Sequence, residues 1–347
     1  MSSVMSGLVG ETDRDVCFEV DGTATYGTLR VPAHRAEQRL AAALLLPGSG
    51  PVDRNGDVPR LGVTPRTVKL IADLLSGHGI MSLRFDKYFT GQTGAGAYAE
   101  HPARIDLAAF IRQAVAAYHL LAGQPEAQKL LVVGHSEGGL YALLTAQHVR
   151  PYPAGLALLQ PMAEPLLSTV ELQATAQLVA DVAAGRLDSA TAKRNAAGVR
   201  QAIGQFRAGR PADTSTLLPG IVRRLTPELL TVENERYVRQ GDAVHPLAAA
   251  AKVAPGTRVL VTAGTRDRNI PVSAIRLLAL VLGGVGATGP GLRVLTGIDH
   301  FLHEAGPEAG PEARPEARPE ADSASHDRRL APAAADALTE WARPFKA

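Results

Sequence analysis

Apolar residues in this chain alternate between short continuous runs and segments with helical spacing. The runs are bounded by polar residues or glycine and predict buried strands. They cover residues 40–46, 80–85, 130–133, 155–159 and 258–264. Between the runs, residues such as Val68, Ile71 and Leu75 recur every three or four positions, which predicts helices with one apolar face. This alternation favours an α/β fold with a mostly parallel sheet covered by helices.

Strands and helices are also expected at the two ends of the chain. Residues 16–20 and 25–31 read as strands joined by an Asp21-Gly22 turn, and with 40–46 they predict an antiparallel lead-in to the sheet. A proline near its start marks a helix from Thr64-Pro65 onward. The remaining predictions are helices at 107–118, 273–282 and 329–341 and a strand at 292–295.

The alternation of predicted strands and helices stops between residues 161 and 246. Leu, Val and Ala recur at helical spacing through 166–184, 190–207 and 217–240, with no convincing strand between them. We therefore predict a core formed by residues 1–160 and 247–347, with residues 161–246 inserted as a helical cap.

Residues 305–327 differ from the rest of the chain in composition. Gly-Pro-Glu-Ala and Arg-Pro-Glu-Ala tetrads repeat there, with a proline at every fourth position. Proline at that spacing blocks a regular helix, and the segment has no large apolar side chains to offset the entropy of ordering. We expect an exposed, flexible loop within the core.

The apolar run at 130–133 leads into Gly134-His135-Ser136-Glu137-Gly138, the Gly-x-Ser-x-Gly pattern of a nucleophile elbow. In such an elbow a strained strand-to-helix turn pushes the serine hydroxyl out of the sheet, and side chains two residues away on either side have no room. Gly134 and Gly138 meet this requirement. The helix that follows would aim free N–H groups, including that of Glu137, at a developing oxyanion. Ser136 is therefore the candidate nucleophile.

A serine nucleophile needs a base that takes its proton and an acid that orients the base. In α/β-hydrolases, whose nucleophile elbow this segment resembles, the acid follows a late strand and the histidine follows the last one. Asp267 lies directly beyond the strand predicted at 258–264, and His300 lies beyond the strand at 292–295. Both loops should leave the same edge of a parallel sheet, so we assign Asp267 as the acid and His300 as the base.

Other acidic residues and histidines fit these roles less well. Asp299 is too close to His300 along the chain to reach across its ring, and Asp242, with His245, precedes the core strand instead of following it. We expect His135 to pack within the elbow. The remaining histidines lack a metal-binding spacing such as His-Glu-x-x-His, so we expect neither a metal nor an organic cofactor.

With the elbow, the acid and the histidine in this order, the chain resembles a serine α/β-hydrolase of the esterase and lysophospholipase-like kind with a helical lid. The resemblance covers nearly the whole length. The family's oxyanion loop, Pro-Gly-Ser-Gly-Pro-x-Asp-Arg, is matched by Pro47-Gly48-Ser49-Gly50-Pro51-Val52-Asp53-Arg54. The resemblance implies that the Ser49 backbone N–H is the second oxyanion donor, beside that of Glu137. Backbone flanked by glycine can turn an amide inward for this purpose.

A second stretch, residues 83–94, resembles the family's Arg-Tyr-Asp-x-Arg-Gly-x-Gly-x-Ser. It departs from that pattern at Tyr88 and Phe89, where the family has a small turn that contains glycine. We therefore expect a differently shaped pocket floor. Asp86 is interpreted as a structural partner of nearby loops.

Composition excludes several classes of protein. The chain has 347 residues, 36 basic against 34 acidic, and a formal net charge of +2, with no basic run that would favour nucleic acid or a membrane surface. The only cysteine, Cys17, excludes an internal disulfide or a thiolate metal site. Residues 1–10 resemble no secretory signal, and nothing approaches the length of a membrane span. We expect a cytoplasmic protein without membrane insertion; whether it forms a homodimer is left open.

These residues predict a serine hydrolase that acts through an acyl-enzyme, with activity lost below about pH 6 to 7 as His300 is protonated. A cap rich in Leu, Val and Ala favours a carboxylic ester of a small to medium apolar substrate. The sequence leaves open a thioesterase, acyltransferase or aminopeptidase with the same triad. It also leaves open a noncatalytic ligand-binding protein on the same fold.

Overall fold

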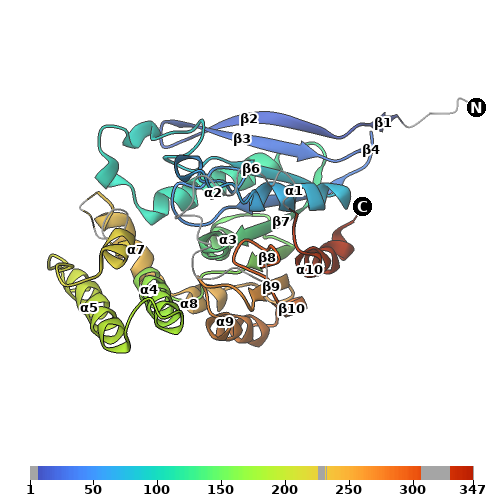
Figure 1. Cartoon of the computed structure of the whole chain (residues 1–347). Helices are drawn as coiled ribbons and strands as arrows, with labels where there is room; N and C mark the ends of the chain where they lie inside the picture. Colours follow the sequence, from blue (N-terminus) through green and yellow to red (C-terminus); the bar gives the residue numbers. More distant parts are fainter. Residues whose placement is uncertain (1–6, 226–230, 232, 306–328, 347) are drawn as a thin grey trace, which may run out of the picture.

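The computed structural model describes residues 7–225, 231, 233–305 and 329–346. Its centre is an eight-stranded sheet with the order β10-β9-β8-β7-β5-β6-β3-β2. Figure 1 shows these strands stacked from β2 at the top to β10 at the bottom. The strands are β2 (Thr12–Val20), β3 (Thr23–Val31), β5 (Leu40–Leu46), β6 (Met81–Phe85), β7 (Ala127–His135), β8 (Gly155–Leu159), β9 (Arg258–Gly264) and β10 (Thr288–Leu295). A separate antiparallel pair joins β1 (Leu8–Val9) to β4 (His34–Arg35).

From β6 to β10 the sheet is parallel, while β3 pairs antiparallel with both β2 and β6. The expected antiparallel lead-in is therefore right for residues 16–20 and 25–31 but wrong for 40–46. In β5, Leu44 pairs parallel with Leu83 of β6 and with Val132 of β7. The physical reason is burial: all seven residues of β5 are buried, as in a central parallel strand with helices on both faces.

Side chains of β5 alternate between two apolar clusters on opposite faces of the sheet. Leu44 belongs to the cluster that contains α2 (Leu107–Ala122), α3 (Glu137–His148), α8 (Pro246–Ala250) and α9 (Val272–Gly284). Leu45 belongs to the cluster that contains α1 (Thr67–Gly77) and α10 (Pro332–Ala342). The predicted layers of helix, sheet and helix are confirmed. Short 3₁₀ helices lie at Pro59–Leu61, Gly96–Tyr98, Pro102–Arg104 and Arg343–Phe345.

Helices follow one another between β8 and β9, where the sequence pattern predicted no strand. They are α4 (Leu166–Ala183), α5 (Ser189–Arg207), α6 (Pro219–Leu225) and α7 (Glu235–Ala243), followed by α8. Figure 1 shows α4, α5 and α7 grouped beside one end of the sheet. The helical spacing at 217–240 corresponds to two helices, α6 and α7, with Thr231 in a bend between them. Pro227 in the sequence between them is a signal against one helix, since an interior proline removes a backbone hydrogen bond.

Some elements begin or end away from their predicted positions. The last helix starts at Pro332 instead of 329, with the proline in its first turn, where a missing N–H costs nothing. The flexible loop predicted at 305–327 lies, apart from Ala305, outside the described residues. Across the described ranges, no helix is both long enough and apolar enough to span a lipid bilayer.

Candidate active site

Ser136 lies at the turn between β7 and α3 with φ 56° and ψ −123°, a backbone conformation that costs free energy for a residue with a side chain. The glycines on either side allow this turn. A Cβ on Gly134 would lie 2.0 Å from the carbonyl oxygen of Gly138, and one on Gly138 would lie 2.2 Å from that of Leu46. A larger residue at Gly134 would therefore push the strand and the helix of the elbow apart, and one at Gly138 would push the turn away from the end of β5.

The structure brings Ser136, His300 and Asp267 together from three separate loops. Nε2 of His300 lies 3.0 Å from Oγ of Ser136, and Nδ1 lies 2.9 Å from Oδ2 of Asp267. A carboxylate accepts hydrogen bonds, so Nδ1 carries the proton that it donates to Asp267 and leaves Nε2 as an acceptor for the serine hydroxyl. This is the arrangement in which an imidazole can remove the proton of a serine.

The Asp267 side chain is fully buried and held by backbone. Its Oδ1 accepts hydrogen bonds from the N–H groups of Asn269 at 2.7 Å and Ile270 at 3.0 Å, which leaves Oδ2 for the histidine. Burial works against a charged imidazolium, but the charge and hydrogen bond of Asp267 outweigh it and raise the pKa of His300 above its ordinary value.

His135 does more than fill space in the elbow. Its Nε2 lies 2.8 Å from the backbone carbonyl of His300, and because a carbonyl only accepts, Nε2 carries the proton. Burial, with a contribution from nearby His300, lowers the pKa of His135 to about 3, so the ring is neutral. A neutral ring that donates from Nε2 holds the loop of His300 against the elbow.

Gln160, which the sequence analysis did not single out, connects the loops of the acid and the base. It follows β8 with φ 48° and is fully buried. Its side-chain oxygen accepts from the Gly264 N–H at 2.8 Å, and its side-chain nitrogen donates to the Asp299 carbonyl at 3.0 Å. No sequence pattern indicates this role, because both partners lie more than a hundred residues away.

The competing acids have other partners. Oδ1 of Asp299 accepts from the backbone N–H groups of Phe301 and His303, both at 2.9 Å. Asp242 lies in α7, where it accepts from the N–H of Leu167 and pairs with Arg207. Neither carboxylate occupies the position that Asp267 holds beside His300.

The loop after β5 passes close to Ser136. A Cβ on Gly48 would lie 3.1 Å from Cβ of Ser136, so the backbone before Ser49 is packed against the elbow. Glu137, whose N–H is the other expected oxyanion donor, is the first residue of α3. The N–H groups in the first turn of a helix have no acceptor within the helix, so they remain available to a ligand.

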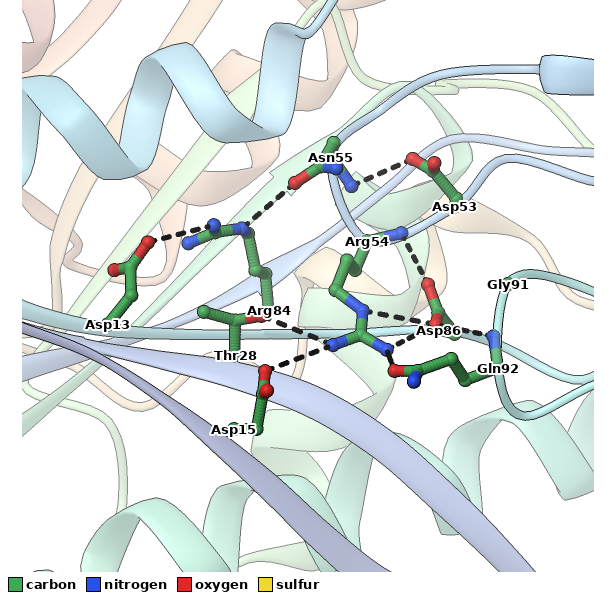
Figure 2. A pocket seen from close by; sticks show the side chains of 10 residues that line it. All are labelled: Asp13, Asp15, Thr28, Asp53, Arg54, Asn55, Arg84, Asp86, Gly91 and Gln92. Carbon is green, nitrogen blue, oxygen red and sulfur yellow. Dashed lines mark hydrogen bonds and ion pairs between the residues drawn. The ribbon is translucent and has the colours of Figure 1, made fainter.

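An ion pair fixes the far end of this loop. Asp86 accepts from Nη2 of Arg54 at 2.6 Å and from its Nε at 3.0 Å, and its other oxygen accepts from the Arg54 backbone N–H at 2.9 Å. Figure 2 shows the pair beside a cavity of about 520 Å³. None of the ten residues that line this cavity belongs to the triad. As expected, Asp86 joins two loops; we call this contact the Arg54–Asp86 clamp.

Phe89 has φ 66°, a left-handed conformation that favours glycine. It stands where the family pattern has glycine, the residue that adopts this conformation at least cost. Tyr88 is buried; its hydroxyl donates to the Val20 carbonyl, and its ring packs edge-on against Tyr98 and Phe110. These contacts hold the Tyr88 side chain inside the protein.

Comparison with known proteins gives a result at the level of structure. No protein-family model matches the chain, and no curated protein matches it in sequence. Among solved structures, Est1E from Butyrivibrio proteoclasticus with bound ferulic acid aligns with a TM-score of 0.53 at 16% identity, over 82% of this chain and 91% of its own. A mutant of the esterase rPPE aligns with a TM-score of 0.53 at 18% identity, over 97% and 83%. The chain has the α/β-hydrolase fold.

A third α/β-hydrolase structure, the acylaminoacyl peptidase of Pyrococcus horikoshii, aligns with a TM-score of 0.51 at 12% identity, over 84% of this chain and 38% of its own.

In this chain the candidate residues lie at the carboxyl edge of the parallel strands. Ser136 follows β7, Asp267 follows β9 and His300 follows β10. Among the residues whose placement is described, no group of three or more His, Cys, Asp or Glu side chains is arranged to hold a metal ion.

Proposed function

We propose that this protein is a serine hydrolase that cleaves carboxylic esters through an acyl-enzyme intermediate. The observation that carries the proposal is the continuous contact from Ser136 Oγ through His300 to Asp267, at 3.0 and 2.9 Å, on a strained elbow. Esterases among the solved structures with the same fold support the reaction class.

In the proposed mechanism, Nε2 of His300 takes the hydroxyl proton as Ser136 Oγ attacks the carbonyl carbon of the ester. The C=O π electrons move to oxygen, and the N–H groups of Ser49 and Glu137 stabilise the oxyanion. The intermediate collapses, the C–O bond to the alcohol breaks, and His300 returns the proton to the leaving oxygen. Water then repeats the sequence on the acyl-enzyme and releases the acid.

We infer an apolar substrate of small to medium size and a cap role for the α4–α7 helices. Apolar residues of these helices, such as Leu167, Val199 and Val238, are buried in the same cluster as the elbow helix α3. Tyr237 of α7 makes a hydrogen bond to Glu137, the residue after the nucleophile. Side chains that cover the elbow in this way favour an acyl or alcohol group without charge.

The test is intact mass after incubation with a fluorophosphonate, together with turnover of p-nitrophenyl butyrate. We expect one label per chain in the parent and none in Ser136→Ala. Ser273→Ala, the same change at an exposed position of α9, is the matched control and should label as the parent does. A folded parent that neither labels nor turns over would contradict the catalytic proposal and favour a ligand-binding protein.

Further acceptors separate the remaining reactions. An alcohol or amine that competes with water for the acyl-enzyme would indicate an acyltransferase. Faster turnover of a thioester or of an aminoacyl amide than of the matched oxygen ester would instead indicate a thioesterase or an aminopeptidase.

A further inference from the structure

Lys87 is a buried cation that the triad does not use. Its side chain follows β6 and the residue is 3% exposed. The ammonium donates to the backbone carbonyl of Gly48 at 2.5 Å and to that of Gly50 at 3.2 Å, and it lies 5.9 Å from the centre of the Phe110 ring. Burying a charge is costly unless other groups compensate it. Here the compensating carbonyls belong to the loop that passes the nucleophile.

The first of these carbonyls is chemically tied to the oxyanion donor. The C=O of Gly48 and the N–H of Ser49 belong to one peptide unit. In the described residues the one cis peptide bond is Arg150-Pro151, so this unit is trans and planar. In a trans peptide the N–H points away from the C=O. A lysine that holds the Gly48 oxygen on one side therefore fixes the Ser49 N–H on the opposite side.

We propose that Lys87 is a positioning residue for the oxyanion hole, which orients the Ser49 N–H through the Gly48 carbonyl and strengthens it as a donor. This inference rests on the proposed function and deepens it. Hydrogen bonds in series polarise one another, so an ammonium on the carbonyl makes the N–H of the same peptide a better donor to a developing negative charge. In a site shielded from water, the positive charge also favours the oxyanion directly.

Groups from several elements face this cation. Glu137 at the start of α3 supplies the opposing charge, and its carboxylate accepts hydrogen bonds from the hydroxyls of Tyr141 and Tyr237. Asp86, next to Lys87 in the chain, is already paired with Arg54. Burial lowers the pKa of Lys87 to about 8, although the charge of Glu137 acts in the opposite direction.

The charge state of Lys87 gives a signature that a merely structural lysine would lack. Lys87 is charged below about pH 8 and neutral above it. The strengthened donor is therefore present on the acid side and weakens as pH rises through that range. We expect kcat/KM of the parent to rise as His300 loses its proton and to fall again near pH 8 as Lys87 does.

The experiment compares Lys87→Met with the parent over pH 6 to 10, with the uncatalysed hydrolysis of p-nitrophenyl butyrate subtracted. Met keeps the length of the side chain but neither donates nor carries charge. We expect kcat to fall about 10- to 100-fold, which is no more than the loss of a complete oxyanion donor would cause. We expect KM to change less than about threefold. The fall of kcat/KM near pH 8, the alkaline limb of the profile, should be absent. Lys129→Met, the same change at an exposed position of β7, should behave as the parent does.

A second variant keeps the test decisive if Lys87→Met fails to fold. Glu137→Gln keeps acceptor and size but removes the charge that raises the pKa of Lys87, so the alkaline limb should move to lower pH. The inference would be overturned if Lys87→Met kept the kcat of the parent and its fall of kcat/KM near pH 8. It would also be overturned if that fall stayed at the same pH in Glu137→Gln. In both cases, fluorophosphonate labelling of the parent would still support the triad. A parent that neither labels nor turns over would overturn both.

Discussion

At the scale of single residues, the contact between Asp267 and His300 determines the acid side of the pH dependence. The carboxylate raises the pKa of His300 above its ordinary value despite burial. Protonated His300 cannot accept the serine proton, so activity is lost as pH falls through this raised pKa and is present above it. The expected loss of activity below about pH 6 to 7 agrees in direction with this geometry.

Replacing Asp267 with Asn tests this contact. The amide oxygen can still accept from the Asn269 and Ile270 N–H groups, so the loop should keep its shape. Without the carboxylate charge, we expect the acid limb of kcat/KM to move to lower pH. We also expect kcat to fall by about 10⁴-fold, the loss known for the change of aspartate to asparagine in a Ser-His-Asp triad. The measurement is a pH–rate profile with p-nitrophenyl butyrate. An acid limb that stays in place would show that Asp267 does not set the pKa of His300.

Residues differ in how far the sequence reveals their role. Ser136 could be identified because its requirements are local: a strand, a strained turn and glycines two positions away. Asp267 and His300 could be identified because the order of strands along the chain indicates which loops meet. The roles of Lys87 and Gln160 could not be predicted, because these residues bind backbone groups of distant loops. Every residue has the same backbone groups, so a sequence pattern does not indicate which of them a side chain will bind.

At the scale of elements, the hydrophobic pattern identified the strands of the eight-stranded sheet but not all of their pairings, and it missed β1, β4 and α8. The run at 40–46 was grouped with its neighbours in sequence, yet β5 pairs with strands that begin at Met81 and Ala127. A continuous apolar run indicates burial on both faces, and that favoured a central parallel position. The sequence therefore indicated the central position of residues 40–46, but we grouped them with the strands that are nearest along the chain.

Helix α7 contacts the elbow through a hydrogen bond, and whether this bond holds the helix in place can be tested. The Tyr237 hydroxyl donates to Glu137, and burial, with the Glu137 charge, raises the pKa of Tyr237 so that the hydroxyl stays protonated. In Tyr237→Phe the buried carboxylate keeps the Tyr141 hydroxyl, at 3.1 Å, but loses this donor. Hydrogen bonds to charged groups contribute about 1.5 to 3 kcal/mol. We expect α7 to open more often and KM to rise.

Hydrogen exchange of residues 235–243 measures the opening, and steady-state kinetics measure KM. Tyr118→Phe is the matched control, because it removes a hydroxyl that donates to the uncharged Pro151 carbonyl. That variant should lose some stability without faster exchange in α7. Equal exchange of α7 in Tyr237→Phe and in the parent would show that the hydroxyl does not hold this helix against the elbow.

At the scale of the whole molecule, parallel strands collect groups that are far apart in sequence. The carboxyl ends of β5, β7, β9 and β10 bring Gly48, Ser136, Asp267 and His300 to one edge, so the site forms only when the sheet is complete. Loops at this edge must be held individually, because the strands fix where each loop begins but not its path. Gln160, Lys87 and the Arg54–Asp86 clamp supply those restraints.

The clamp gives a prediction about global stability. Side chains of Arg54 and Asp86 are 11% and 3% exposed, so Arg54→Met leaves a buried carboxylate without its cation. Breaking a buried pair in this way costs about 3 to 5 kcal/mol. The N–H of Gln92 still donates to Asp86, which favours the lower end of that range.

Arg112→Met is the matched control. It removes an ion pair with Asp21 in which the arginine side chain is 48% exposed, and it should cost no more than about 1 kcal/mol. Urea unfolding measures both changes. A similar loss in the two variants would mean that the buried clamp stabilises the molecule no more than a surface contact does.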